Sequence, residues 1–598
     1  MIACCCLTWC DTKDMCRALK NGYACSSTVI KMDIFFKGGT VLNVYSGELL
    51  EMNVVTRGDR IWYVGPRNNA VEDDTLLLDV TGKVLVPGYI DPHFHPWFIY
   101  NPLSFGETGC AMGTTTLFCD NLIFYLLMGI DLFEGFMEAL SDMPIKYFWF
   151  CRAVPQTPMA EEDALFSVEN LKRLLRHPLV KSLGEITRWQ ALIKGDPKMM
   201  EIIGIAQDLG KRVDGHTAGA RYEHLNVISR VGVESCHEAI TAQEVLDRLR
   251  LGLYVFLRQS SLRQDLTDLL GVVSGKGIST DRIMLTTDSS SPDFYHQFGV
   301  TNHLLDIALR EGIDPIRAYQ MVTINPAVYF GMENHIGGIA PGRYADILIL
   351  KDLFHPKPEM VISRGRIVAE KGRLTEPFPL VNWKGFFPSG SFVRAEWMAE
   401  RNLFEVASSE KRVRFPVIRL VNPVITRVEW IEWDTGDGLL DLSTREGFSF
   451  LALVNKEGRW VTNGIIHGFG DGTEGLAASF NTAAEILVIG RKPEAMGAAV
   501  NRVLEIKGGI VAVEDGKIAL EFPLPLGGIM SDAPMEEIAE RDRHLKAFLS
   551  QRGYPFHDPI YTLVFLPNDF LPDVRINYRG VIDIRKNEVL WPRRDLDH

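Results

Sequence analysis

Between about Val86 and Gly331, short apolar runs typical of buried strands alternate with longer stretches that have the periodicity of helices. The strand-like runs include GTTTLFCD, IKYFWFCRAV, VKSLGE and RIMLTTD, and AQEVLDRLR is one of the helical stretches between them. This alternation predicts parallel βα units. About eight such units over roughly 250 residues favour a closed (β/α)8 barrel over an open doubly wound sheet. We therefore predict an α/β fold with this barrel at residues 86–335.

Short strand-like runs flank the barrel segment on both sides. IFFKGGTVLNV lies before it, and the same pattern of strands broken by turns returns after it in GGIAPGRYADILILKD. We expect residues 33–85 and 336–380 to form one β-sandwich domain, built from both sides of the barrel segment. Residues 381–394 mix Gly, Pro and Ser and predict a linker. Residues 395–598 alternate strand and helix patterns, which predicts a C-terminal mixed α/β domain.

The first 32 residues differ from this plan because they contain six of the ten cysteines. They have neither the apolar core of a signal peptide nor the paired histidines of a common zinc motif. A small metal or redox knot is one alternative. A loose extension at 1–32, or a start site placed too early, is favoured, because MDIFFKGGTVLNV from Met32 is already typical of a first strand. The other cysteines are scattered, which suits a reducing cytoplasm.

Charge and hydropathy exclude two classes of partner. The formal net charge is −13 and no long Lys/Arg cluster occurs, which argues against nucleic-acid binding. The most apolar run, LIFYLLMGI at 122–130, is too short to cross a bilayer. We therefore expect a cytoplasmic protein that acts on a small molecule, with no membrane partner.

Two histidines one residue apart, His93 and His95, follow the first strand-like run of the barrel segment in DPHFHPWF. Alternate side chains of a strand point the same way, so both imidazoles are expected on one side. Alone, this pair is as compatible with a polar strand face as with a metal site. The other strand-like runs of the barrel segment that end in metal-binding side chains end at Glu185, His216, His237 and Asp288.

The carboxyl ends of barrel strands converge on one face, where catalytic sites lie. Four histidines and two carboxylates there predict a divalent-metal site, and one carboxylate can bridge two ions. Water activated by metal indicates hydrolysis, with Asp288 able both to bind metal and to accept a proton. Glu238, next to His237, either supports the ligands or, as we expect, is the solvated start of a helix. Arg258 either orients a polar substrate or forms a structural ion pair.

From about Asp33 to Ile584 the chain resembles the bacterial adenine deaminases of the amidohydrolase superfamily. The resemblance rests on PGYIDPHFH, GTTT, LGE, DGH, SCHE, INPAVYFG and GGIAPGRYADILIL, and in the third domain on AVNRVLEIKGGIVAVEDG and PLPLGGIMSDAP. It implies a metal-dependent barrel flanked by a sheet domain, with a family C-terminal domain. It matches Glu185 to the bridging carboxylate and Asp288 to the catalytic aspartate. The histidines that it matches to metal ligands are His93, His95, His216 and His237.

The activity implied by the resemblance is a hydrolase acting on a C–N bond of a cyclic amidine, converting adenine to hypoxanthine and ammonia. Hydroxide held between two metals would attack C6 of adenine while Asp288 shuttles protons. The implied cofactor is Mn²⁺, or Fe²⁺, in a binuclear centre, and the implied partner is a small purine. A homo-oligomer is compatible with the family. Many hydrolases of cyclic amides have a carboxylated lysine at the bridging position, so Glu185 favours the deaminase branch.

Departures from the family lie near the substrate. Residues 96–99 are Pro-Trp-Phe-Ile in place of Ile-Glu-Ser-Ser, and residues 120–123 are Asp-Asn-Leu-Ile in place of Asp-Pro-His-Glu. Residues 289–291 are serines in place of Asp-Arg-His, and residues 481–484 are Asn-Thr-Ala-Ala in place of His-Asp-Ser-His. Loss of these polar groups should change the substrate more than the chemistry. The candidate substrate contacts are Trp97, Arg258 and Ser289.

Two alternatives to adenine deamination stay open. The first is an amidohydrolase that deaminates or opens a different heterocycle, larger or more apolar, against which Trp97 would stack. The second is a catalytically inactive homologue that acts as a binding protein. Metal content and turnover of a substrate panel distinguish them.

Overall fold

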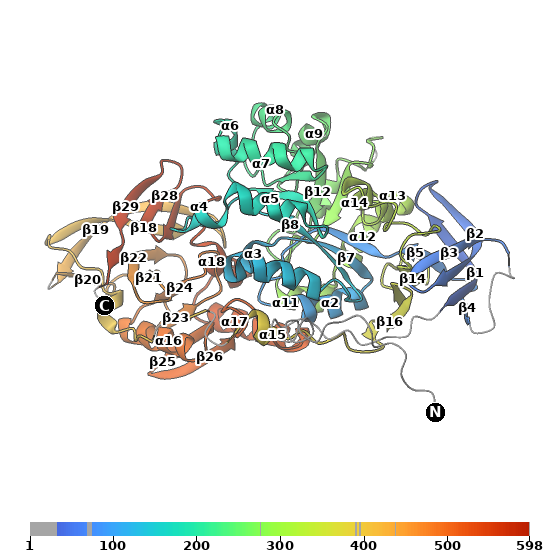
Figure 1. Cartoon of the computed structure of the whole chain (residues 1–598). Coiled ribbons are helices and arrows are strands. Elements are labelled where there is room, and N and C mark those ends of the chain that lie inside the picture. Colours follow the sequence, from blue (N-terminus) through green and yellow to red (C-terminus); the bar gives the residue numbers. More distant parts are fainter. Residues whose placement is uncertain are drawn as a thin grey trace, which may run out of the picture.

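A computed structural model describes the chain at residues 33–67, 75–274, 277–388, 392–393, 396–436 and 438–596. The extension predicted at residues 1–32 lies outside these described residues. Figure 1 shows a sheet of N-terminal strands on one side, a barrel ringed by helices in the centre, and C-terminal sheets on the other side.

Eight parallel strands form the barrel and follow one another around it in chain order. The first and last strands approach each other, since the Thr286 hydroxyl donates to the carbonyl of His93 at 2.8 Å. The barrel is thus nearly closed, and the predicted fold class is confirmed. The strands are β6 (Tyr89–Phe94), β7 (Thr114–Cys119), β8 (Lys146–Cys151), β9 (Val180–Ile186), β10 (Arg212–Gly215), β11 (Ser235–Cys236), β12 (Tyr254–Arg258) and β13 (Ile283–Thr286).

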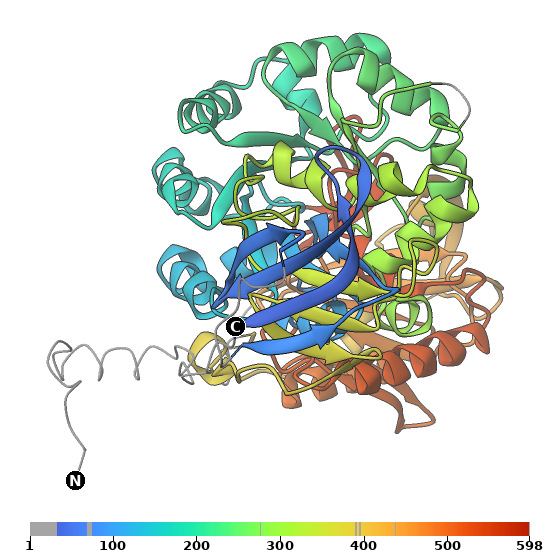
Figure 2. The ribbon, with the colours of Figure 1, turned by 90° about the vertical axis from the view of Figure 1, so that its right-hand side faces the viewer.

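Helices surround the barrel strands, as Figure 2 shows in green and cyan behind the blue sheet. In α5 (Val168–Arg176), Leu171, Leu174 and Leu175 lie on one face and are fully buried. Burial of each leucine contributes about 1.5–3 kcal/mol. Ser167 caps this helix by accepting a hydrogen bond from the amide three residues later, at 3.4 Å.

The other helices of this part follow the same chain order. They are α2 (Pro102–Ala111), α3 (Leu122–Ala139), α4 (Glu162–Leu165), α6 (Trp189–Ile193), α7 (Pro197–Asp208), α8 (Tyr222–Arg230), α9 (Ala242–Arg250), α10 (Leu266–Leu270), α11 (Pro292–Phe298), α12 (Thr301–Arg310), α13 (Pro315–Gln320) and α14 (Ile324–Tyr329). None of the helices in the described part of the chain is both long and apolar enough to span a bilayer.

Strands from both sides of the barrel segment join in one nine-stranded sheet, because β14 pairs antiparallel with β5. A buried ion pair ties this sheet to the barrel: Nζ of Lys146 on β8 lies 2.8 Å from Oδ1 of Asp346. The strands are β1 (Ile34–Asn43), β2 (Glu48–Arg57), β3 (Arg60–Gly65), β4 (Leu76–Asp79), β5 (Val84–Pro87), β14 (Ile347–Leu350), β15 (Met360–Ser363), β16 (Arg366–Glu370) and β17 (Arg373–Leu374).

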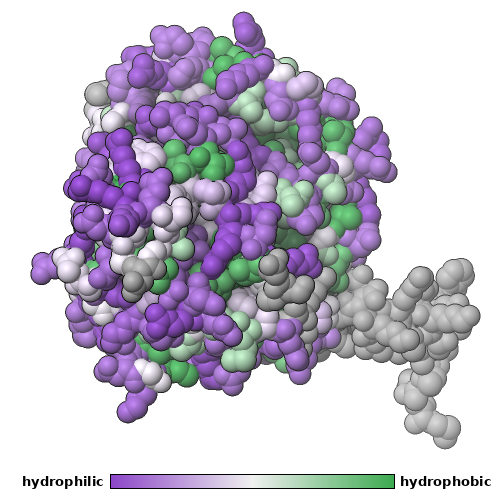
Figure 3. All heavy atoms as spheres, turned by 90° about the vertical axis from the view of Figure 1, so that its left-hand side faces the viewer, coloured by the Kyte–Doolittle hydropathy of each residue, from purple (hydrophilic) through white to green (hydrophobic). Residues whose placement is uncertain are grey.

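The C-terminal part contains a ten-stranded sheet, a three-stranded sheet and helices, in agreement with the predicted mixed α/β composition. Its outer face is mainly hydrophilic, with small scattered hydrophobic patches (Figure 3). Tyr561 on α18 donates a hydrogen bond to the carbonyl of Ser289 on the barrel, so α18 contacts the catalytic end of the barrel.

The helical elements after residue 380 are α15 (Trp383–Phe386), η1 (Arg401–Phe404), α16 (Pro493–Glu505), α17 (Met535–Ser550) and α18 (Pro559–Phe565). The strands are β18 (Arg412–Leu420), β19 (Thr426–Gly436), β20 (Leu439–Leu440), β21 (Phe448–Val454), β22 (Trp460–His467), β23 (Gly475–Ala478), β24 (Ile486–Gly490), β25 (Gly509–Glu514), β26 (Lys517–Pro523), β27 (Val574–Asn577), β28 (Gly580–Asp583), β29 (Glu588–Pro592) and β30 (Arg594–Asp595).

Candidate active site

All six side chains predicted as ligands lie near the carboxyl ends of barrel strands and face one another. The strands deliver them in pairs with complementary positions: β6 supplies two imidazoles, β9 and β13 supply the carboxylates, and β10 and β11 supply the remaining imidazoles. The residues are His93 and His95 at β6, Glu185 in β9, His216 after β10, His237 after β11 and Asp288 after β13.

One half of the cluster forms around the carboxylate of Asp288. Its Oδ1 atom lies 3.3 Å from Nε2 of His93 and 3.2 Å from Nε2 of His95. These three side chains offer donor atoms within 4.8 Å of one another. A small cation could therefore contact all three.

The other half of the cluster forms around Oε2 of Glu185. This atom lies 3.0 Å from Nδ1 of His216 and 3.0 Å from Nε2 of His237. It also lies 3.8 Å from Nε2 of His93, whose ring stacks on that of His237 at 4.0 Å. His93 thus belongs to both halves, and Glu185 lies where one carboxylate could contact two ions.

The cluster fits a divalent metal by a test internal to the structure. Both ring nitrogens of His93 and Nε2 of His216 are buried and have no hydrogen-bond partner. Burial of an imidazole nitrogen without a partner costs free energy unless a ligand satisfies it. Imidazoles and carboxylates are the donors that Mn²⁺, Fe²⁺ and Zn²⁺ accept. The donor set therefore matches a bound metal better than a purely hydrogen-bonded core.

Charged side chains behind the cluster set its protonation. Burial raises the pKa of Glu185, but Arg152 and His216 outweigh it and hold that pKa well below its usual value. Burial likewise opposes ionisation of Asp288, and Arg258 outweighs it, so its pKa is also well below the ordinary value. Both carboxylates are therefore anionic, as metal ligands must be.

The imidazoles differ from one another. Burial and the neighbouring His93 lower the pKa of His237 to about 4, which leaves that ring neutral. Burial also disfavours charge on His95, but Asp120 and Asp288 outweigh it and raise its pKa to about 10. A proton must therefore leave His95 before the ring binds metal.

Two supporting residues were not predicted from the sequence. Asp120 Oδ2 lies 2.8 Å from Nδ1 of His95, and Nη1 of Arg152 lies 2.5 Å from Oε1 of Glu185. Both are fully buried. Asp120 ends the strand-like run GTTTLFCD, so the strand-end signal that pointed to the ligands also pointed to it. Arg152 follows an apolar strand in the same way.

The expectation for Glu238 was wrong. Its side chain is 8% exposed, and its carboxylate accepts from Arg258 at 2.6 Å and from Arg263 at 3.1 Å. Those two guanidinium groups, contributed by a neighbouring strand and loop, remove it from solvent. Arg258 in turn contacts Asp288. The structural ion pair expected for Arg258 as one alternative is therefore present, next to the cluster.

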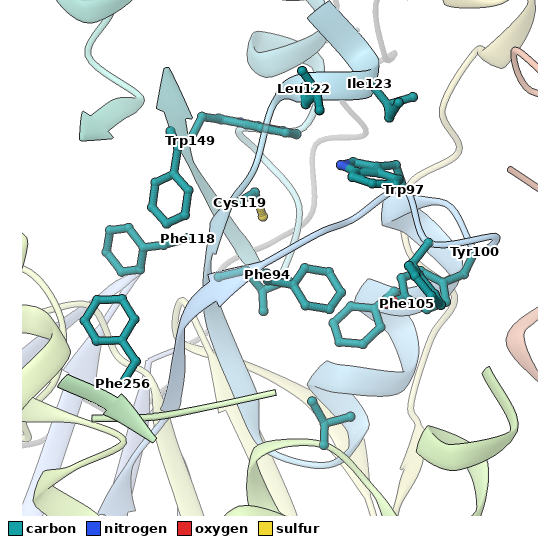
Figure 4. Packing of buried hydrophobic residues seen from close by; sticks show 14 of the residues in the cluster. Phe94, Trp97, Tyr100, Phe105, Phe118, Cys119, Leu122, Ile123, Trp149 and Phe256 are labelled. Atoms are coloured by element: carbon teal, nitrogen blue, oxygen red, sulfur yellow. The ribbon is translucent and has the colours of Figure 1, made fainter. Parts of the chain in front are cut away.

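A cavity of about 1440 Å³ opens over the cluster, between the barrel and the C-terminal part. Trp97 and Arg258 line it, whereas Ser289 is not among its lining residues. Instead the hydroxyl of Ser289 accepts from the amide of His95 at 2.8 Å. Trp97 is 2% exposed and lies with Phe94, Tyr100 and other buried rings beyond β6 (Figure 4). The C-terminal side of the cavity is aromatic and includes Phe556, Tyr561, Phe565 and Phe570.

Two family models match the chain. One is described as Amidohydrolase family and matches residues 84–368, and the other is described as Adenine deaminase C-terminal domain and matches residues 423–588. A relative from Halalkalibacterium halodurans, named "Putative adenine deaminase BH0637", is 37% identical over 562 residues, which cover 94% of this chain and 95% of the relative. The chain belongs to the adenine deaminase family.

Other members of the adenine deaminase family cover the chain to a similar extent. The protein of Moorella thermoacetica named "Adenine deaminase" is 30% identical over 559 residues, or 92% of this chain and 94% of that protein. Among solved structures, a beta-aspartyl dipeptidase from Fervidobacterium islandicum AW-1 matches with a TM-score of 0.46 and 16% identity, over 58% of this chain and 99% of that one. The amidohydrolase family implies a divalent metal, and the cluster described above offers the donors for one.

Proposed function

We propose that this protein hydrolyses adenine to hypoxanthine and ammonia with a divalent metal held at the barrel cluster. The main observation in support is the convergence of four histidines, Glu185 and Asp288 at the carboxyl end of the barrel, in a member of the adenine deaminase family. Manganese, or iron, is the metal that the family resemblance favours, and a binuclear centre is the form that a carboxylate contacting two ions favours.

Each ligand has a role in this proposal. His93, His95 and Asp288 would hold one ion, and Glu185, His216 and His237 would hold the second. Bound there, a divalent ion supplies Lewis-acid activation of water and of the ring.

Asp288 is the residue best placed to move protons. Its carboxylate is ionised and contacts Arg258, which keeps it in the basic form. It would accept a proton from the attacking water and return it to the amino nitrogen that leaves as ammonia. Glu185 is held on its other oxygen by Arg152, so it stays in place while the reaction proceeds.

The aromatic lining of the cavity would bind the planar ring. The ring of Phe570 lies edge-on to that of His216, with centroids 5.1 Å apart, so it borders the space next to the ligands. Aromatic contacts of this kind are sequence-neutral in polarity and favour a flat heterocycle. Trp97 borders the same space from the barrel side, 5.4 Å from His95 between ring centroids.

The size of the cavity favours a second candidate, a heterocycle larger than adenine. Pockets for drug-sized ligands measure about 300–1,000 Å³, whereas this cavity measures about 1440 Å³. The polar segment that follows the paired histidines in the family is replaced here by Pro96, Trp97, Phe98 and Ile99. The same metal chemistry would then act on a ring with an additional substituent or an additional fused ring.

A substrate panel separates the two candidates. Manganese-loaded protein is assayed for ammonia release with adenine, other aminopurines, aminopterins and cyclic amides. The proposal expects saturable release of ammonia from adenine. Turnover confined to a non-purine would support the second candidate instead, and absence of turnover with full metal occupancy would support a binding protein.

A further inference from the structure

Two loops at the catalytic end of the barrel contain non-glycine residues with left-handed backbone geometry. Ile99, after β6, has φ 66°, and Asp288 and Ser289, after β13, have φ 46° and 62°. Such a φ is a genuine outlier for a β-branched residue and uncommon for aspartate and serine. It persists only where surrounding groups over-determine it. The groups that hold these loops therefore bear on the position of Asp288.

The two loops first hold each other. The Ser289 hydroxyl accepts from the amide of His95 at 2.8 Å and contacts its carbonyl oxygen at 3.2 Å. Asp288 therefore cannot move along its loop without disturbing the backbone of His95, which lies on the other side of the same half of the cluster.

The remaining contacts come from the C-terminal part. The Tyr561 hydroxyl on α18 donates to the carbonyl of Ser289 at 3.2 Å, and the amide of Ser531 donates to the carbonyl of Ile99 at 2.6 Å. Tyr561 is 4% exposed and its ring packs against Phe98 at 5.0 Å. Both left-handed segments are thus bound by groups far away in the sequence.

Tyr561 also joins a wider network of hydrogen bonds. Its hydroxyl accepts from the Ser261 hydroxyl at 3.2 Å, and Ser261 Oγ accepts from the amide of Ser291 at 2.9 Å. Nζ of Lys546 on α17 donates to Ser291 Oγ at 2.8 Å and is fixed by buried Asp542 at 3.0 Å. Residues 289–291 are where this chain departs from the family pattern, and these are the residues that the network contacts.

We propose that Tyr561 is a positioning residue, which holds the loop of Asp288 in its left-handed conformation and so places the carboxylate beside His93 and His95. The C-terminal part would then contribute to the reaction itself, in addition to covering the cavity. The role in turnover rests on the proposed function, whereas the role in holding the loop does not.

The variant Tyr561→Phe tests this inference, because it keeps the ring on Phe98 and removes only the hydroxyl. Tyr554→Phe is the matched control: Tyr554 is also buried in the C-terminal part, and its hydroxyl bonds to Thr562 at 2.6 Å, within that part alone. Amide hydrogen exchange of residues 286–291 is measured by mass spectrometry on the full chain, together with metal content, kcat and KM.

Loss of one hydrogen bond of ordinary strength corresponds to a factor of about 2–13 in an equilibrium. We expect Tyr561→Phe to accelerate exchange in residues 286–291 by about that factor and to lower kcat on the order of tenfold, with KM and metal content within about twofold of wild type. Tyr554→Phe should match wild type in all four. Unchanged exchange in Tyr561→Phe, or equal acceleration in both variants, would overturn the inference. If the wild type releases no ammonia from adenine but the exchange contrast appears, the proposed function fails and the positioning role stands.

Discussion

Oδ1 of Asp288 lies 3.2 Å from Nε2 of His95, although 193 residues separate them along the chain. The other nitrogen of that imidazole contacts Asp120 at 2.8 Å, so the ring is held on both sides. The barrel produces this contact because its first and last strands are neighbours. The carboxylate proposed to move protons therefore lies among the ligands themselves.

Asp288→Asn should abolish most turnover while preserving the size of the side chain. General acid–base catalysis contributes about 10²–10⁴-fold, so kcat should fall by that factor. Ammonia release gives the rate. Asp293→Asn is the control, because that carboxylate pairs with Arg543 on the protein surface at 2.9 Å. Retention of more than about a tenth of kcat by Asp288→Asn would rule out the proton-shuttle role.

Glu185→Gln should lose metal. The neutral amide cannot replace an anionic oxygen that lies within 3.0 Å of both His216 and His237. Removal of a supporting group typically lowers metal affinity about 10–100-fold, and removal of a ligand should exceed this. Elemental analysis after dialysis gives the stoichiometry. Glu234→Gln, which removes a carboxylate paired with Arg212 away from the cluster, should keep wild-type metal content. Equal metal in both variants would contradict the assignment of Glu185.

Asp346→Ala should destabilise the fold by breaking the joint between barrel and sheet. Lys146 is 1% exposed and would lose its partner at 2.8 Å. A buried charge left without its partner costs about 3–5 kcal/mol. Urea titration followed by fluorescence measures the loss. Glu359→Ala removes an exposed pair with Lys83 and should cost less than about 1 kcal/mol. Similar losses in the two variants would show that the buried pair has no special weight.

Phe570→Ala should weaken substrate binding more than chemistry. Its ring borders the ligands at 5.1 Å from that of His216. Stacking of a base on an aromatic ring contributes about 1–3 kcal/mol by alanine substitution, which corresponds to roughly 5–150-fold in KM. Steady-state kinetics with adenine separates KM from kcat. Phe354→Ala, at a ring that is 65% exposed, should leave both unchanged. An unchanged KM in Phe570→Ala would place the ring of the substrate elsewhere.

Strand periodicity predicted the barrel and the placement of its ligands well, because barrel geometry forces every strand end to the same face. His93, Glu185 and Asp288 could be brought together on paper for that reason alone. The same rule would have identified Asp120 and Arg152, whose strand-end positions have the same form. Only the residue types that usually bind metals were searched for, so these two were missed.

Tertiary contacts account for what the sequence did not predict. Glu238 follows a histidine ligand and precedes a helix, which is typical of a solvated position, yet two arginines from β12 and the next loop bury it. The contact of Tyr561 with Ser289 joins residues 272 positions apart in different parts of the fold. No local pattern encodes such a contact, since it depends on how α18 packs on the barrel.

The central claim is adenine hydrolysis at the metal cluster, and the initial rate of ammonia release from adenine tests it most directly. Protein loaded with manganese, and verified to contain the metal, is compared with Glu185→Gln at matched concentration. The account predicts saturable release by the wild type, with kcat/KM of about 10⁴ M⁻¹ s⁻¹ or more, and loss of that release in Glu185→Gln. No ammonia from adenine with the metal in place, or equal rates in the two proteins, would contradict it.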